Sequence, residues 1–251
     1  MVEHRFGIKA CVALVLVWAS LISGGVFATE QDPRYVIAED LTVLFRAARS
    51  TFVSHPDLMT NATQSSVTVD EFMAETIATY QTLRGKPLAE DQPLIQSLLR
   101  SIKGVIASAK KGQYKNKWPE GEFKNRFIPA RFGREVSVRF NFQTWPQAAM
   151  RITAPDAYLV NPLSKADEWE RMVMENHFSQ ADWVKGEVFA GEGVYRDKQA
   201  YRVALPEYYT EACLACHGGE VGQRIHQGKI EGHLGDLGAI ISVVVTDQGQ
   251  K

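Results

Sequence analysis

Two cysteines and a histidine stand at a short fixed spacing late in the chain. The stretch Cys213-Leu214-Ala215-Cys216-His217 has the form C-x-x-C-H, which is typical of a c-type haem attachment site. Two thiols two residues apart can add to the two vinyl groups on one edge of a haem, and the next imidazole then lies beneath the ring, where it can bind iron. The spacing predicts one covalent haem c, held by Cys213 and Cys216, with His217 as the proximal ligand.

Three other roles for these cysteines compete with that prediction. A structural zinc site would use His226 and His233, but the gaps from Cys216 to His226 and from His226 to His233 do not match the usual finger spacings. A thioredoxin-like redox pair would open a helix after a strand in a βαβ unit, and no such unit is visible. A chance pair, or a simple disulfide, is the third alternative.

The first 28 residues have the order of a secretory signal peptide. Arg5 and Lys9 precede a nearly uninterrupted apolar run, and small residues ending at Ala28 close it. We expect cleavage after Ala28, which makes residues 1–28 a signal peptide and residues 29–251 a single mature domain. An uncleaved membrane anchor is the alternative, but the apolar run is short for a bilayer span.

The cysteine count agrees with export. The chain has three cysteines, and Cys11 would leave with the signal peptide, so the mature chain would keep only Cys213 and Cys216. A secreted domain built on a disulfide framework would contain more cysteines. Because c-type haem is attached after export in bacteria, the pattern predicts a periplasmic protein.

Composition and charge exclude several kinds of partner. Lys plus Arg number 28 and Asp plus Glu number 29, so the chain lacks the basic field that nucleic-acid binding requires. A hydrophobic content of 45% permits a substantial core. No second apolar segment is long enough to span a membrane, so we expect no membrane contact after signal cleavage.

The elements that must position the motif begin with helices. Apolar residues at helical spacing predict a first helix from about Pro33 to Phe52, limited by Pro56. Thr68 and Glu71 form a capping-box pattern at the start of a second helix that ends at Gly85. A third helix is predicted over 93–111. The segment 127–142 is ambiguous, because it fits either a helix or an extended strand.

Strand signals follow in the second half of the chain. They combine β-branched or aromatic residues with alternation or flanking turns, and they lie at 150–153, 184–190, 200–205 and 238–245. Helices first and strands later predict an α+β fold with an antiparallel sheet.

Four segments, taken together, carry a resemblance to a known family. They are 123–130 ahead of the sheet, Asn161-Pro162 followed by 166–170, the C-x-x-C-H site with its following glycine, and the closing strand 235–243. The chain resembles the secreted or membrane-tethered haem c domains with a PAS-like fold, which occur alone or as sensor modules of bacterial signalling proteins. The resemblance implies a PAS-like antiparallel β-sheet with N-terminal helices packed against it, and one covalent haem.

The chain departs from this family at the sixth iron ligand. Some members use a cysteine on their N-terminal helical part, and the mature chain has no spare cysteine. His55 and Met59 follow the first helix roughly where those relatives carry it, so His55 is the expected distal ligand and Met59 the runner-up. His177, Met150 and an open or water-bound position are the alternatives.

Several other residues have both a structural and a functional interpretation. Trp169 fits the core better than a haem pocket, whereas Tyr208 and Tyr209 are placed to pack on the haem edge. Three arginines could either lie on a solvated face or contact the haem propionates: Arg126, Arg131 and Arg134.

Two functions fit these features. The first is sensing of redox state, or of a small gas such as nitric oxide or carbon monoxide, through a redox or signalling partner. The alternative is a small periplasmic electron-transfer protein. A peroxidase-like enzyme would need a second haem or a distal acid–base pair, and the sequence indicates neither, so we expect no enzymatic activity.

Overall fold

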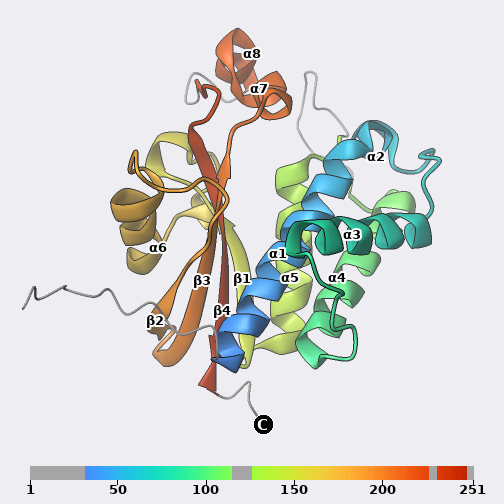
Figure 1. The fold of residues 1–251 in the computed structure, drawn as a ribbon. Helices are drawn as coiled ribbons and strands as arrows, with labels where there is room; N and C mark the ends of the chain where they lie inside the picture. The colour runs from blue at the N-terminus through green and yellow to red at the C-terminus, as the bar shows by residue number, and fades with distance from the viewer. Residues whose placement is uncertain (1–31, 115–125, 226–230, 248–251) are drawn as a thin grey trace, which may run out of the picture.

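The computed structural model describes residues 32–114, 126–225 and 231–247 of the 251-residue chain. The expected signal peptide and His226 lie outside these residues. Within them, an antiparallel sheet has a layer of N-terminal helices on one face and a short helix on the other (Figure 1). The predicted α+β fold, a PAS-like antiparallel sheet with N-terminal helices packed against it, is confirmed. No helix in the described ranges combines the length and the apolar character needed to cross a bilayer.

The first half of the chain forms the helical layer. Its helices are α1 (Pro33–Ser54), α2 (Pro56–Asn61), α3 (Val69–Arg84), α4 (Pro93–Lys110) and α5 (Pro129–Thr144). The ambiguous segment 127–142 is therefore mostly helical. Pro56 does end α1, but it also opens α2, which the sequence had not indicated. Proline is well suited to the first position of a helix, because its missing N–H would have no intrahelical partner there.

The expected capping box is present at the start of α3. The backbone N–H of Glu71 donates to Thr68 Oγ1 at 3.1 Å, and the backbone N–H of Thr68 donates to the Glu71 carboxylate at 2.7 Å. At the other end Gly85 has φ 66°, a left-handed conformation that favours glycine. Both ends of the second predicted helix are thus confirmed.

The four described strands are β1 (Ala148–Thr153), β2 (Phe189–Tyr195), β3 (Lys198–Tyr208) and β4 (Leu237–Thr246). They pair in the order β1-β4-β3-β2, and every pairing is antiparallel. The predicted strand at 184–190 was misplaced, because β2 begins only at Phe189. Its central Gly191 and Gly193 have low strand propensity, which hid the true strand behind the more apolar residues before it.

Alternate residues of the sheet separate its two faces. On one face Met150, Val203 and Val243 join the main core with α1, α4 and α5. Aromatic rings fill the helical side of this core, and Phe52 stacks on Phe132 with ring centroids 4.5 Å apart. This core fixes the sheet against α1, whose C-terminal end leads into His55, the expected distal ligand.

A buried ion cluster attaches α6 (Glu168–Val173) to the other face. Asp167 caps α6, and Arg202 of β3 donates to its carboxylate at 2.7 Å. Glu170 is fully buried, 3.5 Å from Arg202 Nη2. The Arg202 guanidinium also lies 4.4 Å from the centroid of Trp169, and Gly193 allows this close approach. Trp169 thus packs against a second, smaller core between α6 and the sheet, as expected.

Short helical segments complete the chain. A 3-10 turn (Asp156–Tyr158) and a second one (Pro162–Ser164) precede α6, and a π-helical turn (Met174–Phe178) follows it. The Asn161 side chain accepts from the Leu163 N–H at 3.1 Å, so Asn161-Pro162 opens a helical turn. The last helices are α7 (Glu211–His217) and α8 (Gly219–Ile225).

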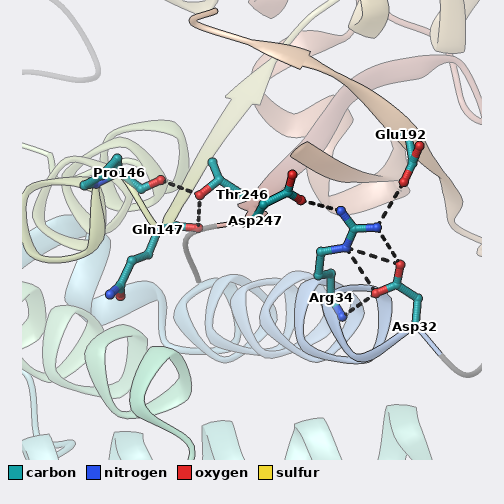
Figure 2. Close-up of polar contacts among 7 residues, drawn as sticks. All are labelled: Asp32, Arg34, Pro146, Gln147, Glu192, Thr246 and Asp247. Carbon is teal, nitrogen blue, oxygen red and sulfur yellow. Dashed lines mark hydrogen bonds and ion pairs between the residues drawn. The ribbon is translucent and has the colours of Figure 1, made fainter. Parts of the chain in front are cut away.

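The start of α1 is tied to the sheet through Arg34. Figure 2 shows its guanidinium between Asp32, Glu192 of β2 and Asp247 at the end of β4, with N–O distances of 2.8, 3.0 and 2.6 Å. In the same view Thr246 donates to the carbonyl of Pro146 at 2.8 Å. The hydrogen bonds from Arg34 hold the pKa of Asp32 below its usual value.

Replacing Arg34 by methionine should lower the free energy of unfolding by about 1 kcal/mol, a modest loss because most of the partners are solvated. Since the folded-state pKa of Asp32 is lowered, its stabilisation is present above about pH 4 and is lost as pH falls through that folded pKa. Urea titrations at several pH values should therefore show the difference from wild type shrinking in acid.

The control for this prediction is Lys103→Met. Lys103 and Asp70 also form an ion pair at 2.8 Å, but both side chains are exposed, so this variant should match wild type. An Arg34→Met loss that stayed constant from neutral to acid pH would contradict the assigned role of Asp32.

Candidate functional site

The C-x-x-C-H segment is a short helix at one end of the sheet. In Figure 1, α7 lies beyond the end of β3, next to α8. No residue of α7 is buried, and its two cysteines are half-exposed and not joined by a disulfide. Helical spacing places Cys213, Cys216 and His217 on one face of α7. Two cysteine sulfurs and an imidazole therefore face the same side of the helix.

Backbone hydrogen bonds fix both ends of α7. The N–H of Cys213 donates to the Thr210 carbonyl at 2.9 Å, and the N–H of Gly232 donates to the His217 carbonyl at 2.8 Å. Gly218 and Gly232 form an isolated parallel β-bridge. The segment that leads into β4 thus lies beside the C-terminal end of α7 and holds His217 in place.

An aromatic ring packs on the imidazole of His217. Tyr209 and His217 are stacked with centroids 5.2 Å apart and planes 18° apart. Tyr209 is itself packed on Tyr158 at 5.3 Å, and Tyr158 donates to Asp236 Oδ2 at 2.6 Å. Burial raises the pKa of Tyr209, and burial together with the bond to Asp236 raises the pKa of Tyr158 to about 12. Both rings are therefore neutral at physiological pH.

Two arginines of α1 bring positive charge to this end of the sheet. Arg49 pairs with the carboxylate of Glu207 in β3. Arg46, one turn earlier, has no carboxylate partner among the described residues. Loss of hydration lowers the pKa of both, that of Arg49 to about 10, and the negative charge of a Cys213 thiolate acts on Arg49 in the opposite direction. A partly desolvated cation of this kind favours a carboxylate ligand.

Two of the arginines singled out from the sequence have other surroundings. Arg131 lies 5.7 Å from the ring centroid of Tyr114 and 3.6 Å from Glu135, and Arg134 is exposed. Arg46 and Arg49 were missed. The available signal was their spacing of three residues within a helix that is otherwise largely buried.

His55 lies at the junction of α1 and α2. Its Nε2 is 2.6 Å from a carboxylate oxygen of Glu75, and its ring lies 6.4 Å from that of Phe72. Met59 is packed against the main core, and its carbonyl accepts from the Phe127 N–H at 2.9 Å. Distal ligation by His55 stays a prediction, and it would require the imidazole to leave Glu75.

The alternative distal ligands belong to other parts of the molecule. Met150 is only 1% exposed and sits in the main core. His177 stacks on Phe189 at 4.1 Å and contacts Trp183 on the side of the sheet that α6 covers. His233, which was considered only for a zinc site, is exposed, with Nδ1 3.3 Å from Asp236. Among described residues, no group of three or more His, Cys, Asp or Glu side chains is arranged to hold a metal ion.

Comparison with known proteins identifies the family. The family model described as Tll0287-like matches residues 48–246, so the chain belongs to the Tll0287-like family. This membership confirms the resemblance indicated by the four sequence segments. A similar solved structure is described as the crystal structure of the cyanobacterial heme-protein Tll0287. It shares 15% identity with a TM-score of 0.38 over 64% of this chain and 97% of that one. Among curated proteins, none matches.

Proposed function

We propose that this protein is a c-type cytochrome that binds one covalent haem through Cys213 and Cys216, with His217 as its proximal ligand. The observation that carries the proposal is α7 itself, which presents two half-exposed cysteines and an imidazole on one face. Membership of the Tll0287-like family supports it, because Tll0287 itself is described as a heme-protein. Bound haem would supply a redox-active iron, and the protein would determine its ligands and surroundings.

The residues around α7 fit such a group. The thiols would form thioether bonds, and Nε2 of His217 would face the iron, because Nδ1 is buried within the protein. Arg46 and Arg49 would offset the negative charge of the propionates, in place of the three arginines first considered. Export of residues 29–251 would place the haem-binding domain in the periplasm, where covalent attachment occurs.

We further propose that the protein senses redox state, or a small gas such as nitric oxide or carbon monoxide, and acts through a partner protein rather than as an enzyme. The contacts of the protein's own distal candidates support an accessible sixth position. His55 is bonded to Glu75, His177 is stacked on Phe189, and Met150 is buried. If none of them binds the iron, an external ligand can occupy that position.

The alternative function is electron transfer. Its support is the location of α7 at the exposed end of the sheet, where none of its residues is buried. A haem attached there would present an edge to a redox partner. A carrier should have six-coordinate iron that binds nitric oxide slowly, whereas a sensor should have an open or easily displaced position.

Spectra of protein matured in a host that attaches haem test the proposal. The reduced pyridine haemochrome should show the α band of c-type haem, and the haem should resist acid–acetone extraction. Extractable haem, or zinc in its place, would refute the attachment. Intact mass on the same sample should correspond to cleavage after Ala28, and a mass that includes residues 1–28 would favour an anchor.

Spectra with nitric oxide then decide between sensing and electron transfer. High-spin iron that binds the gas tightly supports sensing, and low-spin iron that resists it supports electron transfer. If wild type is low-spin, His55→Ala should make it high-spin, whereas His233→Ala, which changes an exposed histidine also close to a carboxylate, should not. An unchanged low-spin spectrum in His55→Ala would exclude His55 and leave Met59 as the next candidate.

A further inference from the structure

We propose that Tyr209 is a positioning residue that fixes the plane of the His217 imidazole and thereby tunes the iron that this imidazole binds. The inference rests on the proposed function and assigns a role to a residue that contacts the ligand rather than the iron. It starts from the nearly parallel stacking of the two rings, 5.2 Å between centroids and 18° between planes. Offset stacking at this distance is a favourable aromatic geometry.

The chain around Tyr209 is built to hold its ring at this place. The N–H of Tyr209 donates to the carbonyl of Asp236 at 2.8 Å, and its carbonyl accepts from Gly235 at 2.9 Å. Tyr209 is 8% exposed and also packs against Tyr158. With its backbone bonded on both sides and its ring enclosed, Tyr209 is a firm support for the imidazole.

Two glycines leave the space that this ring occupies. A Cβ at Gly238 would lie 2.2 Å from Tyr209 Cε1, and a Cβ at Gly232 would lie 2.4 Å from Cε2 on the opposite edge. Any side chain at either position would displace the ring. Gly232 also binds the His217 carbonyl, so the same residue positions the backbone of the ligand and admits the ring beside it.

The chemical consequence concerns rotation of the imidazole. A histidine ligand can turn about its side-chain bonds, and proteins usually fix its orientation with a hydrogen bond from the second ring nitrogen. The flat face of Tyr209, stacked on the imidazole of His217, restricts that rotation by contact as well. The angle of the imidazole plane controls its overlap with the iron orbitals, so the reduction potential and the ligand field depend on this support.

The test compares five variants of the full-length protein, all matured with haem. Tyr209→Leu removes the ring and Gly238→Ala pushes it, whereas Tyr209→Phe keeps it. Two controls match them. Tyr208→Leu changes the neighbouring tyrosine, which packs against the cluster that includes Val173 and Phe178 and donates to the Phe178 carbonyl, rather than lying against His217. Gly191→Ala adds a Cβ in a strand with nothing within 4 Å.

Three quantities are measured for each variant: the haem content, the midpoint potential and the resonance Raman iron–histidine mode. Where the iron is low-spin, ferric electron paramagnetic resonance replaces the Raman measurement. All five should keep covalent haem, since both cysteines remain. Tyr209→Leu and Gly238→Ala should shift the midpoint potential several times more than either control. In both variants the Raman or paramagnetic resonance signal of the iron should be shifted, or split into more than one component. Tyr209→Phe should match wild type.

A wild-type signature and potential in Tyr209→Leu would overturn the proposal, even with a lowered melting temperature, because Tyr209 would then be purely structural. Should Tyr209→Leu fail to fold, Gly238→Ala against Gly191→Ala decides in the same way. A shift of equal size in Tyr208→Leu would also overturn it. Wild-type protein without covalent haem would instead refute the proposed function itself, before any variant is compared.

Discussion

Changing Cys213 and Cys216 together to alanine should abolish covalent haem. Both thioether bonds need a cysteine sulfur, and in the mature chain no other cysteine remains to supply one. Each single variant should retain less haem than wild type, bound through one bond. The intact mass of the double variant should lack the mass of a haem, and its denatured polypeptide should give no haem stain after electrophoresis.

Cys11→Ala is the matched control for this loss. Cys11 lies in the expected signal peptide, so its replacement should leave the mass and the haem content of the mature protein unchanged. Full haem staining in the Cys213→Ala, Cys216→Ala double variant would show that attachment occurs elsewhere. The proposed cytochrome would then be wrong in its central feature.

Replacing Arg202 by methionine should cause the largest loss of stability. Arg202 is 1% exposed and faces the fully buried Glu170, so its removal leaves a buried carboxylate with one fewer countercharge. Breaking a buried pair in this way costs about 3–5 kcal/mol. The loss should be measured as a lower midpoint in urea denaturation, with haem content followed in parallel.

A double variant distinguishes charge from packing. Glu170→Gln removes the charge that needs Arg202, so Arg202→Met should cost less in that background than in wild type. Burial already raises the pKa of Glu170. When the pKa of a carboxyl group is higher in the folded state than in the unfolded state, the protein loses stability as pH rises above the unfolded-state pKa. The Arg202→Met loss should therefore be smaller near pH 5 than at neutral pH. Equal losses in both backgrounds would assign the effect to packing alone.

Local signals predicted much of the fold. The capping box at Thr68, Gly85 after α3 and the apolar spacing of α1 and α4 were all legible, because each feature depends on residues close together in sequence. The strand β2 was not legible in this way, because the reason for glycine at its positions lies in side chains that are close in space but distant in sequence. Gly193 makes room for Trp169 and Arg202, and no local pattern reports that contact.

The candidate site divides in the same way. Cys213, Cys216 and His217 are recognisable because attachment chemistry requires a fixed local spacing. Tyr209 was expected beside the haem edge, but its stacking on His217 depends on glycines from two other segments. Arg49 approaches Glu207 only through the packing of α1 on β3, a contact between residues 158 apart in sequence. Such long-range placements require the fold.

The position of β4 also determines the order in which the molecule can be completed. β4 is the last of the four described strands in sequence, yet it lies between β1 and β3 and pairs with both. A chain emerging from its N-terminus exposes the C-x-x-C-H segment before β4 is available to join the sheet. On the proposed function, the two cysteines are therefore available to a haem-attaching enzyme before β4 completes the sheet.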